Sequence, residues 1–347
     1  MVDESCIICL DTDPPPIQSG CACRGHGGLA HIGCLVEKAV SQQAHRGFEV
    51  WWLCQTCNQR FTGAMRIGLA NAWWLRMCDR AEDDEQRVHA ATNLARSLMR
   101  VEGTFAAAER IMRDVHAVLT RRFGPEHAET LQAAHRISEA LLGLAKYADA
   151  ERILREVLGA RRRTLCPDHR DTLTAAADLA TALTFQQKDA EAELIHREVH
   201  AVECRIHGAE HSETLLTAGN LGLCLTNQGK HDEAERILRG VLRVHKRVLG
   251  EDHPDTLITA SNLVLALDGL KKYAEAERML REVHAAEVRV LGAEHPNTLT
   301  TVRNLSGCLI GQEKYAEAEQ LLEALLPVYR RVHGADHPQT KEVPTRV

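Results

Sequence analysis

The chain has 347 residues, of which 44% are hydrophobic and only 4% are aromatic. This hydrophobic content excludes a disordered polymer, and the scarcity of aromatic residues argues against a β-sandwich or a β-barrel. The formal net charge of -6 lacks the basic excess of a nucleic-acid-binding protein. We therefore expect a mostly α-helical protein that does not bind nucleic acid.

Cysteine and tryptophan are concentrated near the N-terminus. Seven of the 12 cysteines lie before residue 60, and all four tryptophans lie before residue 75. The sequence shows neither a secretory signal pattern nor an apolar run long enough to span a membrane, so we expect a soluble, cytoplasmic protein, with the nucleus as a second location. In such a reduced compartment, clustered cysteines bind metals more often than they form disulfides.

The N-terminal segment contains four closely spaced pairs of possible metal ligands. They are Cys6 and Cys9, Cys21 and Cys23, His31 and Cys34, and Cys54 and Cys57. A structural zinc ion takes four tetrahedral Cys or His ligands, and a short spacing lets one turn of backbone direct two of them at one ion. Eight ligands predict two structural zinc ions, with no open position for catalysis. We expect His26 and His45 to be surface loop residues.

The ligand order and the segments CIICL, GCACRG, AHIGCLVEKA and CQTCNQRF resemble the RING-CH (RING-variant) zinc finger over residues 4–62. The resemblance implies a cross-braced fold with the following ligands: Cys6, Cys9, His31 and Cys34 for zinc 1, and Cys21, Cys23, Cys54 and Cys57 for zinc 2. RING-CH domains generally belong to ubiquitin ligases, which hold a charged ubiquitin-conjugating enzyme and promote transfer by proximity, without a covalent intermediate of their own.

The same resemblance implies a surface for the conjugating enzyme at Ile8, Leu35, Gln55 and Asn58. The family commonly has a tryptophan four residues after the sixth ligand, where this chain has Lys38. That departure favours an alternative function, in which the protein is a non-enzymatic adaptor for protein–protein interactions.

A less favoured alternative is a PHD-like reader of histone tails. PHD fingers have the same ligand order and usually a tryptophan two residues before the seventh ligand, where Trp52 lies. The one-residue gap between Cys21 and Cys23 and the longer gap to His31 fit RING-CH better. We expect either Trp51 or Trp52 to fill the small core and the other to be exposed.

Four segments follow from these patterns: a zinc finger at 1–62, a helical connector at 63–85, a repeat region at 86–340 and a frayed end at 341–347. The connector has apolar residues at helical spacing. Its acidic end, residues 82–85, suits a hinge or a helix start.

The repeat region has a period of 42 residues. Histidine recurs at His127, His169, His211, His253, His295 and His337, and an Ala-Glu pair recurs at Ala108, Ala150, Ala192, Ala234, Ala276 and Ala318. Residues 250–291 form one unit, with one helix from Pro254 to Gly269 and a second from Tyr273 to Gly292. The pattern resembles tetratricopeptide repeats of the kinesin-light-chain kind, which implies six helix pairs stacked into a superhelix with a groove for a protein or peptide.

Several repeat positions have a predicted role. The alanine allows two helices to cross closely, and the histidine lies in a loop before a helix, where capping or packing is expected. An aromatic residue three positions before the alanine is expected to wedge between helices, so the units with Asp189 and His231 should be locally weaker. The other cysteines, Cys78, Cys166, Cys204, Cys224 and Cys308, are expected to share no repeat position and to pack as small apolar residues.

The groove is expected to carry Asp178, Asn220, Asn262 and Asn304, which recur on the first helices. Side-chain amides can hydrogen-bond the backbone of a bound peptide, or they can satisfy polar groups between repeats. The combined prediction is a RING-CH-type ubiquitin ligase, whose zinc head recruits a conjugating enzyme and whose groove binds the substrate protein.

Overall fold

The computed structural model describes residues 6–18, 29–101 and 103–333. The elements in these ranges are β1 (Ile17–Gln18), β2 (Leu29–Ala30), α1 (Ile32–Arg46), the 3-10 helix η2 (Phe48–Trp51), α2 (Gly63–Met77), α3 (Glu85–Leu98), α4 (Phe105–Phe123), α5 (Ala128–Gly143), α6 (Tyr147–Thr164), α7 (Arg170–Phe185), α8 (Asp189–His207), α9 (Ser212–Asn227), α10 (His231–Val248), α11 (Pro254–Gly269), α12 (Tyr273–Val290), α13 (Pro296–Gly311) and α14 (Tyr315–His333). The mostly helical prediction is confirmed. No described helix is long and apolar enough to cross a membrane.

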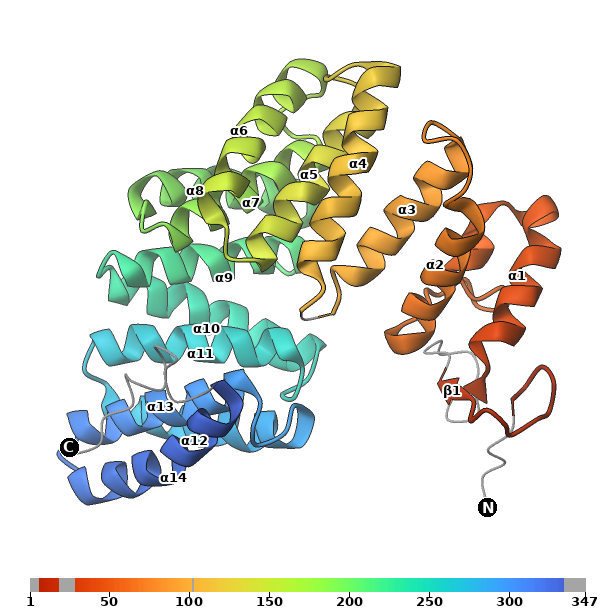
Figure 1. The fold of residues 1–347 in the computed structure, drawn as a ribbon. Helices are drawn as coiled ribbons and strands as arrows, with labels where there is room; N and C mark the ends of the chain where they lie inside the picture. The colour runs from red at the N-terminus through yellow and green to blue at the C-terminus, as the bar shows by residue number, and fades with distance from the viewer. Residues whose placement is uncertain (1–5, 19–28, 102, 334–347) are drawn as a thin grey trace. The chain divides into compact units, whose positions relative to one another are not determined.

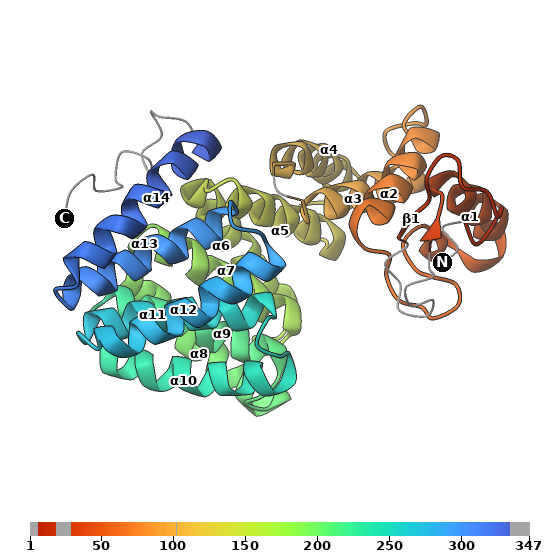
Figure 2. The same cartoon turned by 90° about the horizontal axis from the view of Figure 1, so that it is seen from below.

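The chain divides into two compact units, Met1–Ala175 and Ala176–Val347, with the boundary inside α7. The first unit begins with an irregular head, in which β1 pairs antiparallel with β2 and α1 and α2 pack together. Figure 2 shows α1, β1 and α2 side by side.

The head and α2 share one hydrophobic core. Trp51 and Trp73 are 1% and 0% exposed, and their rings stack at 5.7 Å between centroids. Met65 and Leu69 of α2 complete this core beside Cys6 and Cys54. The predicted connector is therefore helical, but its first part, α2, belongs to the core of the head. A domain as small as the head has little apolar area of its own, and the large aromatic rings supply it.

The acidic stretch at 82–85 starts a helix. The Asp84 side chain accepts a hydrogen bond from the backbone N–H of Arg87 at 3.0 Å, so Asp84 is the N-cap of α3. Capping by a carboxylate satisfies one of the otherwise unpaired amides at the helix start and suits the helix dipole.

Helices α3 to α14 follow the 42-residue period as six consecutive helix pairs (Figure 1). In the repeat at residues 250–291, α11 begins at Pro254 and ends at Gly269, and Gly292, with φ +95°, follows α12. The alanine at the predicted helix crossing is 0% exposed in all six pairs. A small side chain at this position lets the two backbones approach closely.

Three residues that lie three positions before these alanines, Phe105, His231 and Tyr273, pack against a glycine of the next repeat. A Cβ added to Gly311 of α13 would lie 2.7 Å from the ring of Tyr273, and one added to Gly269 of α11 would clash with the ring of His231. Tyr273 thus wedges between helices as predicted, and glycine in the following repeat provides the space at both positions. The expectation that the His231 unit lacks such a wedge needs correction, because the imidazole ring packs against Gly269 as the ring of Tyr273 packs against Gly311.

Candidate functional site

The first cysteine pair lies on a tight turn. The N–H of Leu10 donates to the carbonyl oxygen of Cys6 at 2.8 Å, the N–H of Cys6 donates to that of Asp11 at 2.9 Å, and Leu10 has φ +64°. This turn places the Cys6 and Cys9 side chains together at the start of the chain.

Four of the predicted ligands meet at this turn. One possible ligand atom each from Cys6, Cys9, His31 and Cys34 lies within 4.8 Å of the other three. The Nδ1 atom of His31 is 3.3 Å from the Cys9 sulfur and 3.7 Å from the Cys34 sulfur. A tetrahedral zinc ion, with bonds of about 2.3 Å to sulfur and about 2.0 Å to nitrogen, holds such atoms about 3.5 Å apart. The donor set and its spacing therefore fit zinc 1.

The electrostatics of the cluster also suit a cation. Burial raises the pKa of the Cys34 thiol to about 12, and the sulfurs of Cys9 and Cys6 contribute to this rise. Burial also disfavours the thiolate of Cys6, but backbone hydrogen bonds from Cys9, His31 and Ile8 outweigh it and lower the pKa of Cys6 to about 6. Crowded sulfurs with backbone donors are an environment that a metal ion completes, since zinc binds the thiolate form.

The last cysteine pair forms the same turn. The N–H of Asn58 donates to the carbonyl oxygen of Cys54 at 2.8 Å, the N–H of Cys54 donates to that of Gln59 at 2.8 Å, and Asn58 has φ +55°. Both hydrogen bonds and the left-handed residue occur at the same offsets as in the first turn. The other two predicted ligands of zinc 2, Cys21 and Cys23, lie outside the described residues, as does His26.

The predicted surface for a conjugating enzyme is partly apolar. Ile8 is 40% exposed, Asn58 is also exposed, and Leu35 and Gln55 line a small pocket that includes Ile7 and Phe61. Leu35 itself is 9% exposed, so it contributes little area to a partner.

Lys38 lines this same pocket. A tryptophan at this position would extend the apolar surface, whereas the lysine places a cation there.

Two expectations for the head need correction. His45 lies in the last turn of α1, where its exposed ring is near the negative end of the helix dipole, and not in a loop. Trp51 is buried, with its Nε1–H donating to Gln43 at 2.7 Å. Trp52 is half-buried against Trp73 at 5.8 Å, so it is not the exposed contact that we expected.

The recurring histidines of the repeats are helix caps. In five repeats the Nδ1 atom accepts a hydrogen bond from the backbone N–H two residues later, at 3.1–3.3 Å; these are His127, His169, His211, His253 and His295. His337 lies outside the described residues. The prediction of capping is confirmed, and it assigns these histidines a local structural role.

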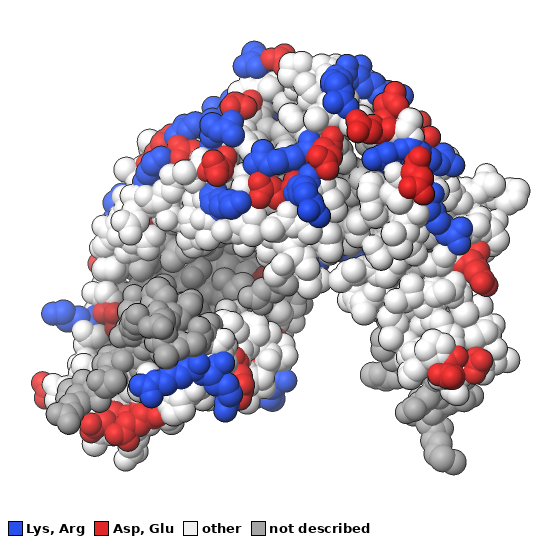
Figure 3. All heavy atoms as spheres, viewed as in Figure 1, with Lys and Arg blue, Asp and Glu red and all other residues white. Residues whose placement is uncertain are grey.

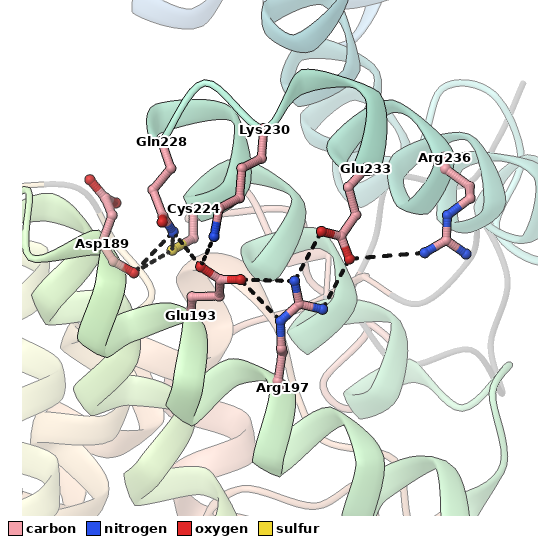
Figure 4. Close-up of polar contacts among 8 residues, drawn as sticks. All are labelled: Asp189, Glu193, Arg197, Cys224, Gln228, Lys230, Glu233 and Arg236. Atoms are coloured by element: carbon pink, nitrogen blue, oxygen red, sulfur yellow. Dashed lines mark hydrogen bonds and ion pairs between the residues drawn. The ribbon is translucent and has the colours of Figure 1, made fainter.

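Ion pairs join successive repeats as well as successive helical turns. Glu193 of α8 pairs with Arg197 at 2.8 Å and with Lys230 at 2.6 Å, and Arg197 also reaches Glu233 of α10 at 3.0 Å (Figure 4). The hydrogen bond from Lys230 is the largest cause that lowers the pKa of Glu193 to about 2. The sequence predicts only the pairs within one helix.

The same arrangement recurs in later repeats. Glu277 pairs with Arg281 and Lys314, and Arg281 pairs with Glu317. On the face drawn in Figure 3, Lys and Arg accordingly lie next to Asp and Glu.

The groove asparagines lie along two pockets in residues 176–347. Asn220 and Asn262 line the first pocket, between α9, α11 and the end of α10. Asn262 and Asn304 line the second pocket, between α11, α13 and the end of α12. The Nδ2 atom of Asn220 also donates to Thr181 at 3.4 Å, and Asp178 is half-buried on α7. Contact with a ligand stays a prediction.

Sequence reasoning missed a row of buried ionisable residues, two of which, His245 and Glu287, line these pockets. Glu203, His245 and Glu287 lie 42 residues apart and are 5%, 7% and 4% exposed. The sequence signal that could have revealed them is a titratable residue that recurs every 42 residues, at one buried position in the second helix of each of these repeats.

The expectation that the cysteines of the repeat region share no repeat position also needs correction. Cys224 and Cys308 are 84 residues apart, so they do share a repeat position, which is alanine at Ala140, Ala182 and Ala266. Both are buried, with 0% and 2% exposure, as small apolar residues. Cys166, by contrast, is exposed.

Comparisons with known families identify the repeat region. A model of the tetratricopeptide repeat matches residues 86–163, 212–287 and 270–331, and a second such model matches residues 172–213. The first model covers more than half of the chain, so the chain belongs to the tetratricopeptide-repeat family. It is a scaffold for protein–protein interactions, because stacked repeats of this kind present an extended surface to protein or peptide ligands.

Solved structures share this fold. A crystal structure of a variant of the nearly identical TPR-like repeats of a putative kinesin light chain from Podosopora anserina is 23% identical, with a TM-score of 0.50, and the match covers 59% of this chain and 96% of that chain. BtubC (BKLC) from P. vanneervenii is 16% identical, with a TM-score of 0.52, and the match covers 67% of this chain and 92% of that chain. At these identities the likeness shows the fold alone. No curated protein matches the sequence.

Proposed function

We propose that this repeat protein is a RING-CH-type ubiquitin ligase, in which a two-zinc head recruits a ubiquitin-conjugating enzyme and the repeat groove binds the substrate. The observation that carries the proposal is the convergence of Cys6, Cys9, His31 and Cys34, with atoms spaced as zinc requires. The matched turn at Cys54 and Cys57 supports a second ion, for which Cys21 and Cys23 would be the remaining ligands.

Both zinc ions would be structural. They would fix the two cysteine turns, and thereby hold Ile8 and the pocket at Leu35 in one orientation toward the conjugating enzyme. The transfer chemistry would belong to that enzyme and its thioester, while the head would contribute proximity and orientation. The proposal places the protein in the cytoplasm or the nucleus, where thiols remain available to metals.

An autoubiquitination assay tests this proposal. The full chain is incubated with ubiquitin, activating enzyme, ATP and a panel of conjugating enzymes. We expect conjugates with at least one enzyme, their loss in Cys6→Ser and Cys54→Ser, and their retention in Cys166→Ser, whose exposed thiol lies in the repeats. If the zinc-loaded protein forms no conjugates with any enzyme of the panel, it is not a ligase.

A non-enzymatic adaptor is the second candidate, and Lys38 favours it. This cation lines the pocket at which an apolar contact to the conjugating enzyme is expected, and Leu35 beside it is nearly covered. An adaptor would capture proteins through head and groove but would retain no conjugating enzyme in a pulldown. The histone-reader alternative predicts that the head binds a histone-tail peptide, and the absence of such binding would exclude it. The packing of Trp52 on Trp73 already gives Trp52 a role in the core.

A further inference from the structure

The two groove pockets form one continuous surface. Ile258 and Asn262 line both of them, so the first pocket, at Asn220, leads into the second, at Asn304. An extended chain laid along the first helices would therefore pass over both pockets.

This surface is acidic. Four carboxylates line the pockets, namely Glu210, Glu213, Asp255 and Glu287, and no lysine or arginine is among the lining residues. Glu210 pairs with Arg247 at 2.5 Å, outside the pocket lining. Glu213 and Asp255 lie near histidines, at 3.9 Å from His207 and 3.8 Å from His253. The local charge therefore favours a cationic ligand.

Glu287 is the most deeply placed of these carboxylates. It is 4% exposed, and its Oε2 atom has no hydrogen-bond partner among the described residues. The Thr301 hydroxyl hydrogen-bonds with its carboxyl group, and His284 and His295 lie near it, but burial outweighs all three effects and raises the pKa of Glu287. A buried carboxyl with an unused oxygen is costly, and a cation or a strong donor brought by a ligand would offset that cost.

The rim of the same pockets is apolar. Leu216, Ile258 and Val290 are 62%, 54% and 47% exposed and lie beside the carboxylates. Exposed aliphatic side chains that lie next to polar groups are typical of a binding surface. Asn262 and Asn304 line the second pocket together with Glu287, and their amides can bond the backbone of an extended peptide.

We propose that the groove selects an extended peptide that carries basic and aliphatic residues, with a lysine or arginine of that peptide directed at Glu287. The aliphatic residues would pack on Ile258 and Val290. This inference rests on the proposed substrate-binding role of the groove and specifies the chemistry of the substrate segment.

Fluorescence anisotropy with the full chain tests the inference. The probes are three labelled peptide pools of equal length, in which leucine alternates with Lys or Arg, with Gln, or with Glu. We expect the basic pool to bind about tenfold or more tightly than the Gln and Glu pools. Glu287→Gln should reduce this preference about tenfold, and Glu213→Gln, in the first pocket, should reduce it less.

Glu282→Gln is the matched control. Glu282 lies on the same helix, but its side chain is 61% exposed and lines a different pocket. It should leave the affinity unchanged, and circular dichroism should show intact helices in all variants. Equal affinity for the three pools, a preference for the Gln or Glu pool, or an unchanged preference in Glu287→Gln would overturn the inference while leaving groove binding in place. Binding of no pool would contradict both the inference and the proposed role of the groove.

Discussion

Asn227 donates a hydrogen bond from Nδ2 to Oδ1 of Asp189 at 3.3 Å. Two repeats later, the corresponding residues are Gly311 and Tyr273, which pack ring against backbone. A short polar pair thus fills the space that a ring and a glycine fill elsewhere. Asp189 is 9% exposed and is hydrogen-bonded to Asn227. This hydrogen bond replaces the aromatic contact that is missing from the repeat, in which the sequence predicts local weakness.

This exchange predicts coupling between the two positions. Asp189→Tyr alone should destabilise the protein, because the ring meets Asn227 where three other repeats have glycine, at Gly143, Gly269 and Gly311. The double variant Asp189→Tyr with Asn227→Gly should recover most of the loss, with a coupling energy of about 1–3 kcal/mol from a double-mutant cycle in urea. Additive effects of the two substitutions would contradict the shared space.

The alanine at the helix crossing is predicted to be intolerant of larger residues. Ala276→Leu should cost about 1–3 kcal/mol of unfolding free energy, because the fully buried site has no room for the added methyl groups. Ala274→Leu on the same helix is the control, since Ala274 is exposed and should tolerate leucine. Thermal melting measures both, and equal melting temperatures would show that the crossing is placed wrongly.

The ion pairs between repeats predict a pH dependence. Lys230 and Lys314 are the leading causes that lower the pKa values of Glu193 and Glu277 from 4.5 to about 2. Because these folded-state pKa values lie below the unfolded one, the pairs stabilise the fold fully above about pH 4.5, and this contribution disappears as the pH falls toward 2.

Glu193→Gln combined with Glu277→Gln should therefore be less stable than the original chain at pH 7, and the difference should shrink between about pH 4.5 and about pH 2. Urea unfolding at about pH 7, 4 and 2.5 measures it, with Glu323→Gln, an exposed glutamate on α14, as the control. A difference that is constant over this range would exclude the ionised carboxylates as its source.

Lys38 offers a test by gain of function. Lys38→Trp would replace a cation in the head pocket with a large apolar ring, and we expect it to strengthen the binding of a conjugating enzyme about tenfold, as burial of an aromatic side chain can provide. Glu37→Trp, on an exposed position of α1, is the control. Titration by calorimetry compares them; equal affinities would show that this pocket does not face the enzyme.

The repeat fold could be predicted from the sequence because its signals are local. The 42-residue period, Pro254 at a helix start, the capping histidines and the buried alanines each depend on one helix or one turn, and the structure confirms them. The likeness in fold to solved repeat structures agrees with this.

Contacts between distant elements could not be predicted in the same way. The pairing of Glu193 with Lys230 depends on how one repeat rotates against the next, which a period alone does not define. The ligand pattern ends near residue 62, so the sequence predicts that Trp73 lies in a connector, yet its ring stacks on Trp51 in the core of the head. The burial of Glu287 could not be predicted because a charged residue in a helical repeat usually faces solvent.

Measuring the zinc content of the protein tests the central claim most directly. This claim is that the N-terminal residues form a metal-stabilised domain that recruits a conjugating enzyme to a repeat scaffold. Elemental analysis of the purified full chain should give about two zinc ions per chain, as eight ligands in closed tetrahedral sites require. Cys9→Ser should lower this number, whereas Cys78→Ser, outside the ligand clusters, should not. Removal of zinc should shift the fluorescence of the buried Trp51 and Trp73 while leaving most of the helical signal of the repeats intact. A chain that folds with its tryptophans buried and contains no zinc would contradict the claim.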